Sequence, residues 1–318
     1  MDITCIGPAI IDVLACPTSP AVFTSGSEPA ETIKLSYGGD ACNEAVALAR
    51  MGCAVNLVSL LGRDEAGDMV FSYLARNHVD TSAITRSHDL PTGINLVLVD
   101  KEGERCFITN PGGSLRHLNE EMIRSHVDDM ADIVSFASFF ISFDLSVDAL
   151  CRTFKAIKQK NDRILAVDFT RPKNGETIET LRPLLPDIDI LFANAEEACM
   201  LCGSSDPAIC AETFVRSGVT CAVVKTGKHG CVLATSSFCL SVPAFSPVEC
   251  VDTTGAGDCF AAGFLYALKQ GMSYPDCARF GCAAASCCVE MVGATEGIRA
   301  IEAIRSRFEH LCQVSNLQ

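Results

Sequence analysis

Residues 251–258 form a polar, glycine-containing run that leads directly into an apolar segment rich in small side chains. The spacing of the apolar residues predicts a helix over 256–269. Gly255 and Gly257 leave the backbone N–H groups at its start uncovered, and the helix dipole makes that end positive. The run therefore predicts an anion site, with the carboxylate of Asp258 in the first helical turn.

A carboxylate at an anion site repels the anion unless it has a further role. Asp258 has such a role if it takes a proton from a hydroxyl group while the nearby N–H groups hold the charge on a transferring phosphoryl group. The structural alternative is an aspartate that only favours a helix N-terminus. The residues of this run leave both interpretations open.

From about residue 119 onward the chain alternates predicted strands and helices. Strands are predicted over 133–137, 164–168, 188–193 and 220–225. This alternation indicates an α/β layered fold with a mainly parallel sheet. Polar residues follow the strand ends, where open parallel sheets bind ligands. They are Asp168, Asn194, Glu197 and Lys225.

Other predicted strands lie outside this alternation of strands and helices. Residues 31–37 alternate like a strand, and 93–100 and 104–109 flank a short turn at 101–103 that contains glycine, which is a hairpin signal. These segments predict a small separate sheet, which is marginal in water unless it packs on another element.

Composition limits the possible functions. The chain has 318 residues, a formal charge of −14 and 48% hydrophobic residues, which favours one large domain over 1–318. We find no basic cluster and no apolar run of about 18 residues, so we expect neither nucleic acid nor a membrane as partner. The 19 cysteines are scattered, and with no apparent secretion signal this favours reduced thiols in the cytoplasm. We expect no metal or redox role for the lone C-x-x-C, Cys199–Cys202.

Two motifs about two hundred residues apart resemble those of one known family. The run 252–258, Asp-Thr-Thr-Gly-Ala-Gly-Asp, and the segment 38–52, followed by Gly-Arg-Asp at 62–64, are similar to the signatures of the ribokinase-like (PfkB) carbohydrate kinases. The resemblance extends from Ile3 to the last helix. It implies a three-layer fold with a mainly parallel central sheet and a small β-sheet lid, with lid strands from about 13–37 and 92–110.

The resemblance also implies roles for individual residues. Asp258 would be the general base. The backbone N–H groups of Gly255, Ala256 and Gly257 would hold the charge on the phosphoryl group. The candidate acceptor-binding residues are Asp12, Gly38, Gly39, Asn43 and, at the pocket rim, Asn110. The candidate nucleotide-binding residues are Asn194, Lys225, Thr226, Gly227 and Gly230. Glu197 is expected to hold Mg²⁺ through water, and Asp252 and Thr254 a monovalent cation such as K⁺.

Two of these assignments have structural alternatives in the residues themselves. Asp12 is also compatible with a hydrogen-bonded turn aspartate. Asn194 is also compatible with a helix N-cap that has Glu197 at the third helical position.

The resulting hypothesis is phosphorylation of a sugar hydroxymethyl group by Mg-ATP. Ribose, fructose, fructose phosphate and 2-keto-3-deoxygluconate all remain possible acceptors. A nucleoside kinase of the same family is the first alternative, although 7% aromatic residues and no Trp favour a plain sugar. The second is a non-catalytic sugar-binding regulator, which the intact Asp258 and Gly-Ala-Gly segment disfavour. The resemblance also implies a homodimer formed through the lid.

Overall fold

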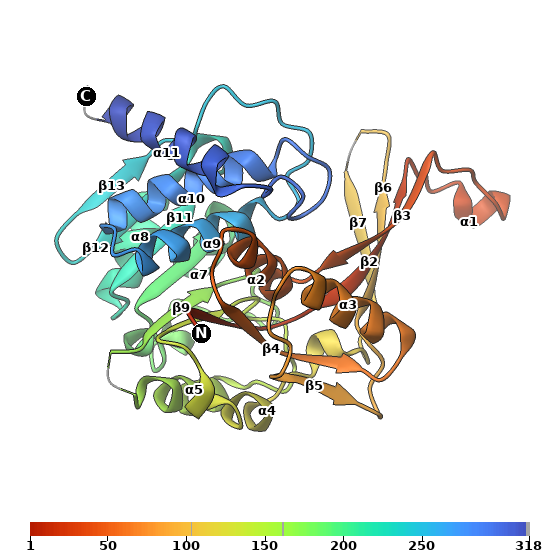
Figure 1. Cartoon of the computed structure of the whole chain (residues 1–318), viewed down its shortest axis with the longest axis horizontal. Coiled ribbons are helices and arrows are strands. Elements are labelled where there is room, and N and C mark those ends of the chain that lie inside the picture. The colour runs from red at the N-terminus through yellow and green to blue at the C-terminus, as the bar shows by residue number, and fades with distance from the viewer. Residues whose placement is uncertain (103, 161, 316–318) are drawn as a thin grey trace.

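The computed structural model describes residues 1–102, 104–160 and 162–315. A nine-stranded sheet runs through its centre in the order β13-β12-β11-β10-β9-β8-β1-β4-β5 (Figure 1). All neighbours from β11 to β5 pair in parallel, and β12 and β13 add an antiparallel edge. The strands are β1 (Ile3–Ile6), β4 (Val55–Gly62), β5 (Ile84–Ser87), β8 (Ile133–Phe136), β9 (Ile164–Asp168), β10 (Ile190–Asn194), β11 (Cys221–Lys225), β12 (Cys231–Thr235) and β13 (Cys239–Val242).

Helices cover both faces of this sheet because successive strand residues point to opposite sides. Ile190 and Phe192 of β10 enter one core, and Leu191 and Ala193 enter the other. The first core is covered by α2 (Asp40–Arg50), α3 (Glu65–Arg76), α9 (Ala256–Lys269), α10 (Tyr274–Cys288) and α11 (Ile301–Ser315). The second is covered by α4 (Glu120–Arg124), α5 (Val147–Lys158), α6 (Ile178–Leu181), α7 (Ala195–Cys202) and α8 (Pro207–Arg216). The expected three-layer α/β fold is confirmed.

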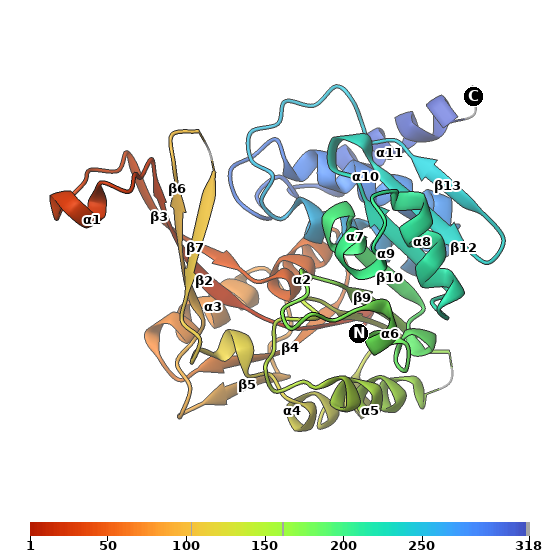
Figure 2. The same ribbon diagram turned by 180° about the vertical axis from the view of Figure 1, so that it is seen from behind.

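A second, four-stranded sheet stands beside the main body, and we call it the lid sheet (Figures 1 and 2). Its order is β3 (Thr32–Gly38), β2 (Ile10–Cys16), β6 (Ile94–Val99) and β7 (Arg105–Thr109), with the short helix α1 (Val22–Ser25) between β2 and β3. β2 pairs antiparallel with β3 and parallel with β6. Gly103, in the expected turn of the β6–β7 hairpin, lies outside the described residues.

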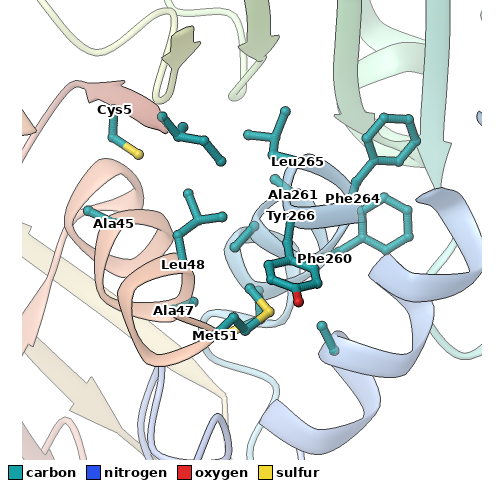
Figure 3. Close-up of a cluster of buried hydrophobic side chains, with 14 of the residues drawn as sticks. Cys5, Ala45, Ala47, Leu48, Met51, Phe260, Ala261, Phe264, Leu265 and Tyr266 are labelled. Carbon is teal, nitrogen blue, oxygen red and sulfur yellow. The ribbon is translucent and has the colours of Figure 1, made fainter. Parts of the chain in front are cut away.

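Helices α2 and α9 pack directly against each other under the central sheet (Figure 3). Ala45 and Leu48 of α2 face α9, whose Ala261 and Leu265 are fully buried. Small side chains at such a contact let two helix axes approach closely. The contact therefore brings the first turns of both helices, and the polar residues they carry, to one place.

Each cysteine is a free thiol, and most are buried, whereas Cys106, Cys239 and Cys250 are exposed. The Cys199 and Cys202 pair lies on α7, and the described residues contain no group of three or more His, Cys, Asp or Glu side chains that could hold a metal ion. Within that same part of the chain, every helix is too short or too polar to span a bilayer.

Candidate active site

The carboxylate of Asp258 accepts a hydrogen bond from a side chain in the first turn of α2. Asn43 Nδ2 donates to Asp258 Oδ2 at 2.7 Å. Burial raises the pKa of Asp258 well above its usual value, the neighbouring carboxylate of Asp40 raises it further, and the Asn43 bond opposes both effects. A carboxylate with a raised pKa is a better proton acceptor than an exposed one, which is the property required of a general base.

The start of α9 depends on a left-handed residue. Gly255 precedes the helix with φ 73°, and a Cβ at this position would overlap the carbonyl oxygen of Ala294. The N–H of Ala256 closes a turn on the Thr253 carbonyl at 3.3 Å. The first N–H groups of a helix have no partner within the helix, so the amide of Gly257, which lines a cavity, is placed to hold an anion.

The ammonium group of Lys225 lies against this helix start. A Cβ added to Gly257 would lie 3.3 Å from Lys225 Nζ. Lys225 Nζ also donates to Asp168 Oδ2 at 2.6 Å. The two side chains come from the ends of β11 and β9, at the edge of the sheet where ligand-binding residues are expected.

The lid sheet contributes a second carboxylate. Asp12 on β2 pairs in register with Asn95 on β6, and Asn95 Nδ2 donates to Asp12 Oδ1 at 3.0 Å. Burial raises the pKa of Asp12. A Cβ on Gly38 would overlap Asp12 Oδ2, so this glycine permits the carboxylate to lie against the backbone of β3. Gly39 follows at the N-cap of α2.

Asn110 lies in the turn after β7 and makes its contacts there. Its Oδ1 accepts from the Ile94 N–H at 3.4 Å, and its side chain fills the space where a Cβ of Gly113 would be. These contacts indicate that Asn110 stabilises its own turn, and among the described residues we find no hydrogen bond that joins it to Asp12 or Asp258. Its place at the pocket rim stays a prediction.

A cavity of about 370 Å³ extends from Lys225 and Gly257 along α9 and α10. Near Lys225 it is lined by Gly227 and Gly230, which flank the turn after β11. Further away the lining is mostly apolar and comprises Ala244, Phe245, Val248, Phe260, Ala285 and Val289. Thr226 lies instead in an adjoining hollow together with Asn194. A cavity that is apolar at one end and cationic at the other suits a nucleoside with phosphates.

Asn194 and Glu197 form a reciprocal cap at the start of α7. Asn194 Oδ1 accepts from the Glu197 N–H at 2.9 Å, and Glu197 Oε2 accepts from the Asn194 N–H at 2.8 Å. The structure therefore confirms that Asn194 is the N-cap of α7, with Glu197 at the third helical position. Burial raises the pKa of Glu197 to about 7. A nearby cation would favour the charged carboxylate. Glu197 is therefore also suited to contact Mg²⁺ through a water molecule bound to the ion.

Asp252 joins the loop before α9 to the loop after α10. Its Oδ1 accepts from the N–H of Thr254 at 2.9 Å and from its hydroxyl at 2.7 Å, and its Oδ2 accepts from the Gly293 N–H at 3.0 Å. The carbonyl oxygens of Thr254 and Ala294 lie close by, since both accept from the Cys288 thiol. This gathering of oxygen atoms fits the ligand chemistry of a hard cation.

Two further polar residues in this region, Asn95 and Ser138, belong to none of the motifs found in the sequence. Asn95 interrupts an otherwise apolar strand, and that single polar residue is the one hint available. Ser138 follows β8 with φ 58°, and its hydroxyl donates to the Asp40 carboxylate. Both are buried, so a lost partner would leave a buried polar group unsatisfied.

The structure brings the Asp258 carboxylate, the first turn of α9, the Lys225 ammonium group and a cavity of about 370 Å³ together at one edge of a mainly parallel sheet. The chain belongs to the pfkB family of carbohydrate kinases, whose model matches residues 1–301. Its class is therefore that of ATP-dependent carbohydrate kinases.

Known proteins resemble the chain over most of its length. An uncharacterized sugar kinase of Archaeoglobus fulgidus is 30% identical over 255 residues, which are 79% of this chain and 97% of the relative. A ribokinase of Haemophilus influenzae is 26% identical over 294 residues, 89% and 92% of the two chains. The solved structure of Arabidopsis thaliana ribokinase complexed with ribose and ATP is similar in fold, with a TM-score of 0.80 at 24% identity over 96% and 98% of the chains.

Proposed function

We propose that this kinase transfers the γ-phosphoryl group of ATP to a hydroxymethyl group of a small sugar, with Asp258 as the general base. The observation that carries the proposal is the position of the Asp258 carboxylate. It lies in the first turn of α9, beside the amide of Gly257 and the ammonium group of Lys225. A base and an anion site at one helix end are the two groups that phosphoryl transfer to a hydroxyl requires.

The acceptor is held on the lid side of Asp258. Asp12 accepts hydrogen bonds from sugar hydroxyls, and Asn95 fixes the orientation of that carboxylate. Asn43 holds Asp258 so that its carboxylate takes the proton of the reacting hydroxyl. The Gly257 amide and Lys225 then hold the negative charge on the phosphoryl oxygens as the bond to the acceptor forms.

Mg²⁺ and a monovalent cation complete the proposal. Mg²⁺ neutralises phosphate oxygens, and Glu197 would hold it through water. Asp252 and the carbonyl of Thr254 would hold K⁺ and thereby keep the two loops at the start of α9 together. Rates compared in K⁺ and in tetramethylammonium test this second site. Equal rates would remove K⁺ from the proposal.

The outer face of the lid sheet supports a homodimer. The strand register places Leu35 and Ile108 in one row, on the face opposite Asp12. Ile33, Leu35, Ile94 and Ile108 are 73, 55, 40 and 48% exposed on this face. An apolar sheet face of this kind is stabilised when a second copy covers it.

Sedimentation of wild type and of Leu35→Glu tests the dimer. We expect the wild type to sediment as a dimer and Leu35→Glu as a monomer. Phe23→Glu on α1, where the side chain is 81% exposed off the sheet, is the matched control and should remain dimeric. A monomeric wild type would refute this interface.

ADP release from Mg-ATP across neutral sugars, sugar acids, sugar phosphates and nucleosides tests the function. We expect turnover on one sugar, and a loss of about 10²- to 10⁴-fold in Asp258→Asn. Ribose, fructose and 2-keto-3-deoxygluconate are the first acceptors to compare. Turnover on nucleosides alone would favour the nucleoside kinase alternative, and a near-wild-type rate in Asp258→Asn would refute the assigned base.

A further inference from the structure

We infer that Asp168 is a positioning residue, whose carboxylate holds the ammonium group of Lys225 in the orientation needed at the anion site of α9. The inference rests on the proposed phosphoryl transfer. It adds to that proposal a residue that acts through Lys225.

The geometry fixes Lys225 between two elements. Lys225 Nζ lies 2.6 Å from Asp168 Oδ2, and the two side chains are only 14 and 8% exposed. The ammonium group also lies near the backbone at Gly257, where an added Cβ would lie 3.3 Å away. β9 and β11 are separated by β10, so the two side chains reach toward each other across the end of that strand. Lys225 is therefore held by the Asp168 carboxylate on one side and lies near the start of α9 on the other.

The ion pair keeps the lysine charged in a site with several acids. Burial lowers the pKa of Lys225, and Asp168 is the largest opposing influence, so that the net pKa is raised. Three further carboxyl groups face Lys225 from neighbouring elements, namely Glu44 of α2, Glu197 of α7 and Asp258 of α9. Glu44 is fully buried and accepts from the Ser135 hydroxyl, and burial raises its pKa well above the usual value.

The pair also leaves donors for a second contact. A lysine ammonium group has three N–H donors on a flexible stem. With one donor held by Asp168, the others remain for phosphoryl oxygens at the Gly257 amide. Since the pair is neutral as a unit, we expect Asp168 to affect turnover more than the binding of ATP.

The first test is Asp168→Asn, which keeps the shape of the side chain and removes its charge. We expect kcat to fall about 10- to 100-fold while KM for ATP changes less than about threefold. Without the carboxylate, burial lowers the Lys225 pKa, so the rate should fall with rising pH at a lower pH than in wild type. The matched control is Asp189→Asn, which breaks the Lys158–Asp189 pair of 2.5 Å at the far end of α5. It should lower stability and leave the pH profile unchanged.

A double-mutant cycle separates positioning from a general structural role. If Asp168 acts through Lys225, Asp168→Asn should change kcat less than about threefold in a Lys225→Met background. The inference would be overturned if Asp168→Asn lowered kcat equally in the wild-type and Lys225→Met backgrounds. It would also be overturned if the alkaline limb of the pH–rate profile stayed where it is in wild type. The Lys225→Met/Asp168→Asn protein removes both charges of the pair, so it also shows whether an unpaired partner in the single variant explains poor folding.

Lysine-selective NMR gives a readout that does not depend on turnover. The Lys225 signal should titrate at lower pH in Asp168→Asn than in wild type, and an unchanged titration would overturn the inference. If wild type itself phosphorylates no acceptor, the kinase proposal fails. The NMR titration then still decides whether Asp168 holds the charge on Lys225.

Discussion

The side-chain amide of Asn43 donates to the Asp258 carboxylate at 2.7 Å, although 215 residues separate the two along the chain. The bond joins the first turns of α2 and α9, which the buried contact between these helices brings together. It favours the charged carboxylate, whereas burial and Asp40 disfavour it. One contact therefore influences both the orientation and the proton affinity of the candidate base.

Asn43→Ala should move the acidic limb of the kcat/KM profile to higher pH. The variant loses the bond that lowers the Asp258 pKa, so the base becomes deprotonated only at higher pH. At pH 7 we expect kcat/KM to fall about tenfold. The control is Asn56→Ala, which removes a buried amide that accepts from the Thr4 hydroxyl away from the site. If the pH profile of kcat/KM is the same in Asn43→Ala as in wild type, the bond does not have this role.

Asp258→Asn should be more stable than wild type at pH 7, by about 1 kcal/mol. The folded state binds the Asp258 proton more tightly than the unfolded state, because burial raises the pKa. Wild type therefore loses stability as the pH rises from the unfolded pKa through the folded one, and the amide does not. Urea unfolding at several pH values measures this. The advantage of the variant should shrink toward pH 4, and a variant less stable than wild type at pH 7 would contradict it.

Glu197 should make the apparent affinity for Mg²⁺ depend on pH. With a pKa of about 7, the side chain is largely protonated below that pH and charged above it. The Mg²⁺ concentration for half-maximal rate should fall as the pH rises through about 7, and Glu197→Gln should abolish this dependence. Glu196→Gln is the control, since that exposed side chain is 3.6 Å from Arg171. The same pH dependence in all three proteins would exclude Glu197 as the cause.

Gly255→Ala should reduce stability by about 2 kcal/mol or more and reduce turnover with it. The methyl group would meet the Ala294 carbonyl in a left-handed conformation, so the start of α9 must shift. Gly271→Ala provides the comparison, because Gly271 has a similar φ of 76° and open space around it. That variant should lose about 1 kcal/mol and keep its kcat. Equal effects in thermal unfolding and turnover would show that the Ala294 contact is unimportant.

The helix that carries Asp258 could be predicted to the residue. The apolar spacing predicts 256–269, and α9 has these bounds. The strands that end at Asp168 and Lys225 were also predictable, because buried parallel strands are short apolar runs followed by polar residues. The pairing of these two side chains was not, since it depends on the order of strands across the sheet.

Asn95 and Ser138 show a different limit. Asn95 contacts Asp12 only because β2 and β6 pair in parallel in one particular register, which the hairpin signal does not specify. Ser138 lies in no motif and reaches Asp40 from the end of another strand. Motifs identify residues near each other in sequence, whereas these contacts are set by the packing of whole elements. The roles of the site residues remain predictions for the experiments above.

The placement of Asp12 and Asn95 on the lid sheet, while Asn43 and Asp258 lie on the main body, has a consequence for the timing of the reaction. In the proposed reaction the acceptor contacts both structural units at once, so the reactive arrangement would depend on the spacing between these units. A water molecule would replace only part of the contacts proposed for a sugar, so it would contribute little binding energy toward holding the units together. Loss of phosphoryl groups to water should therefore be slow until a sugar of the correct length has entered.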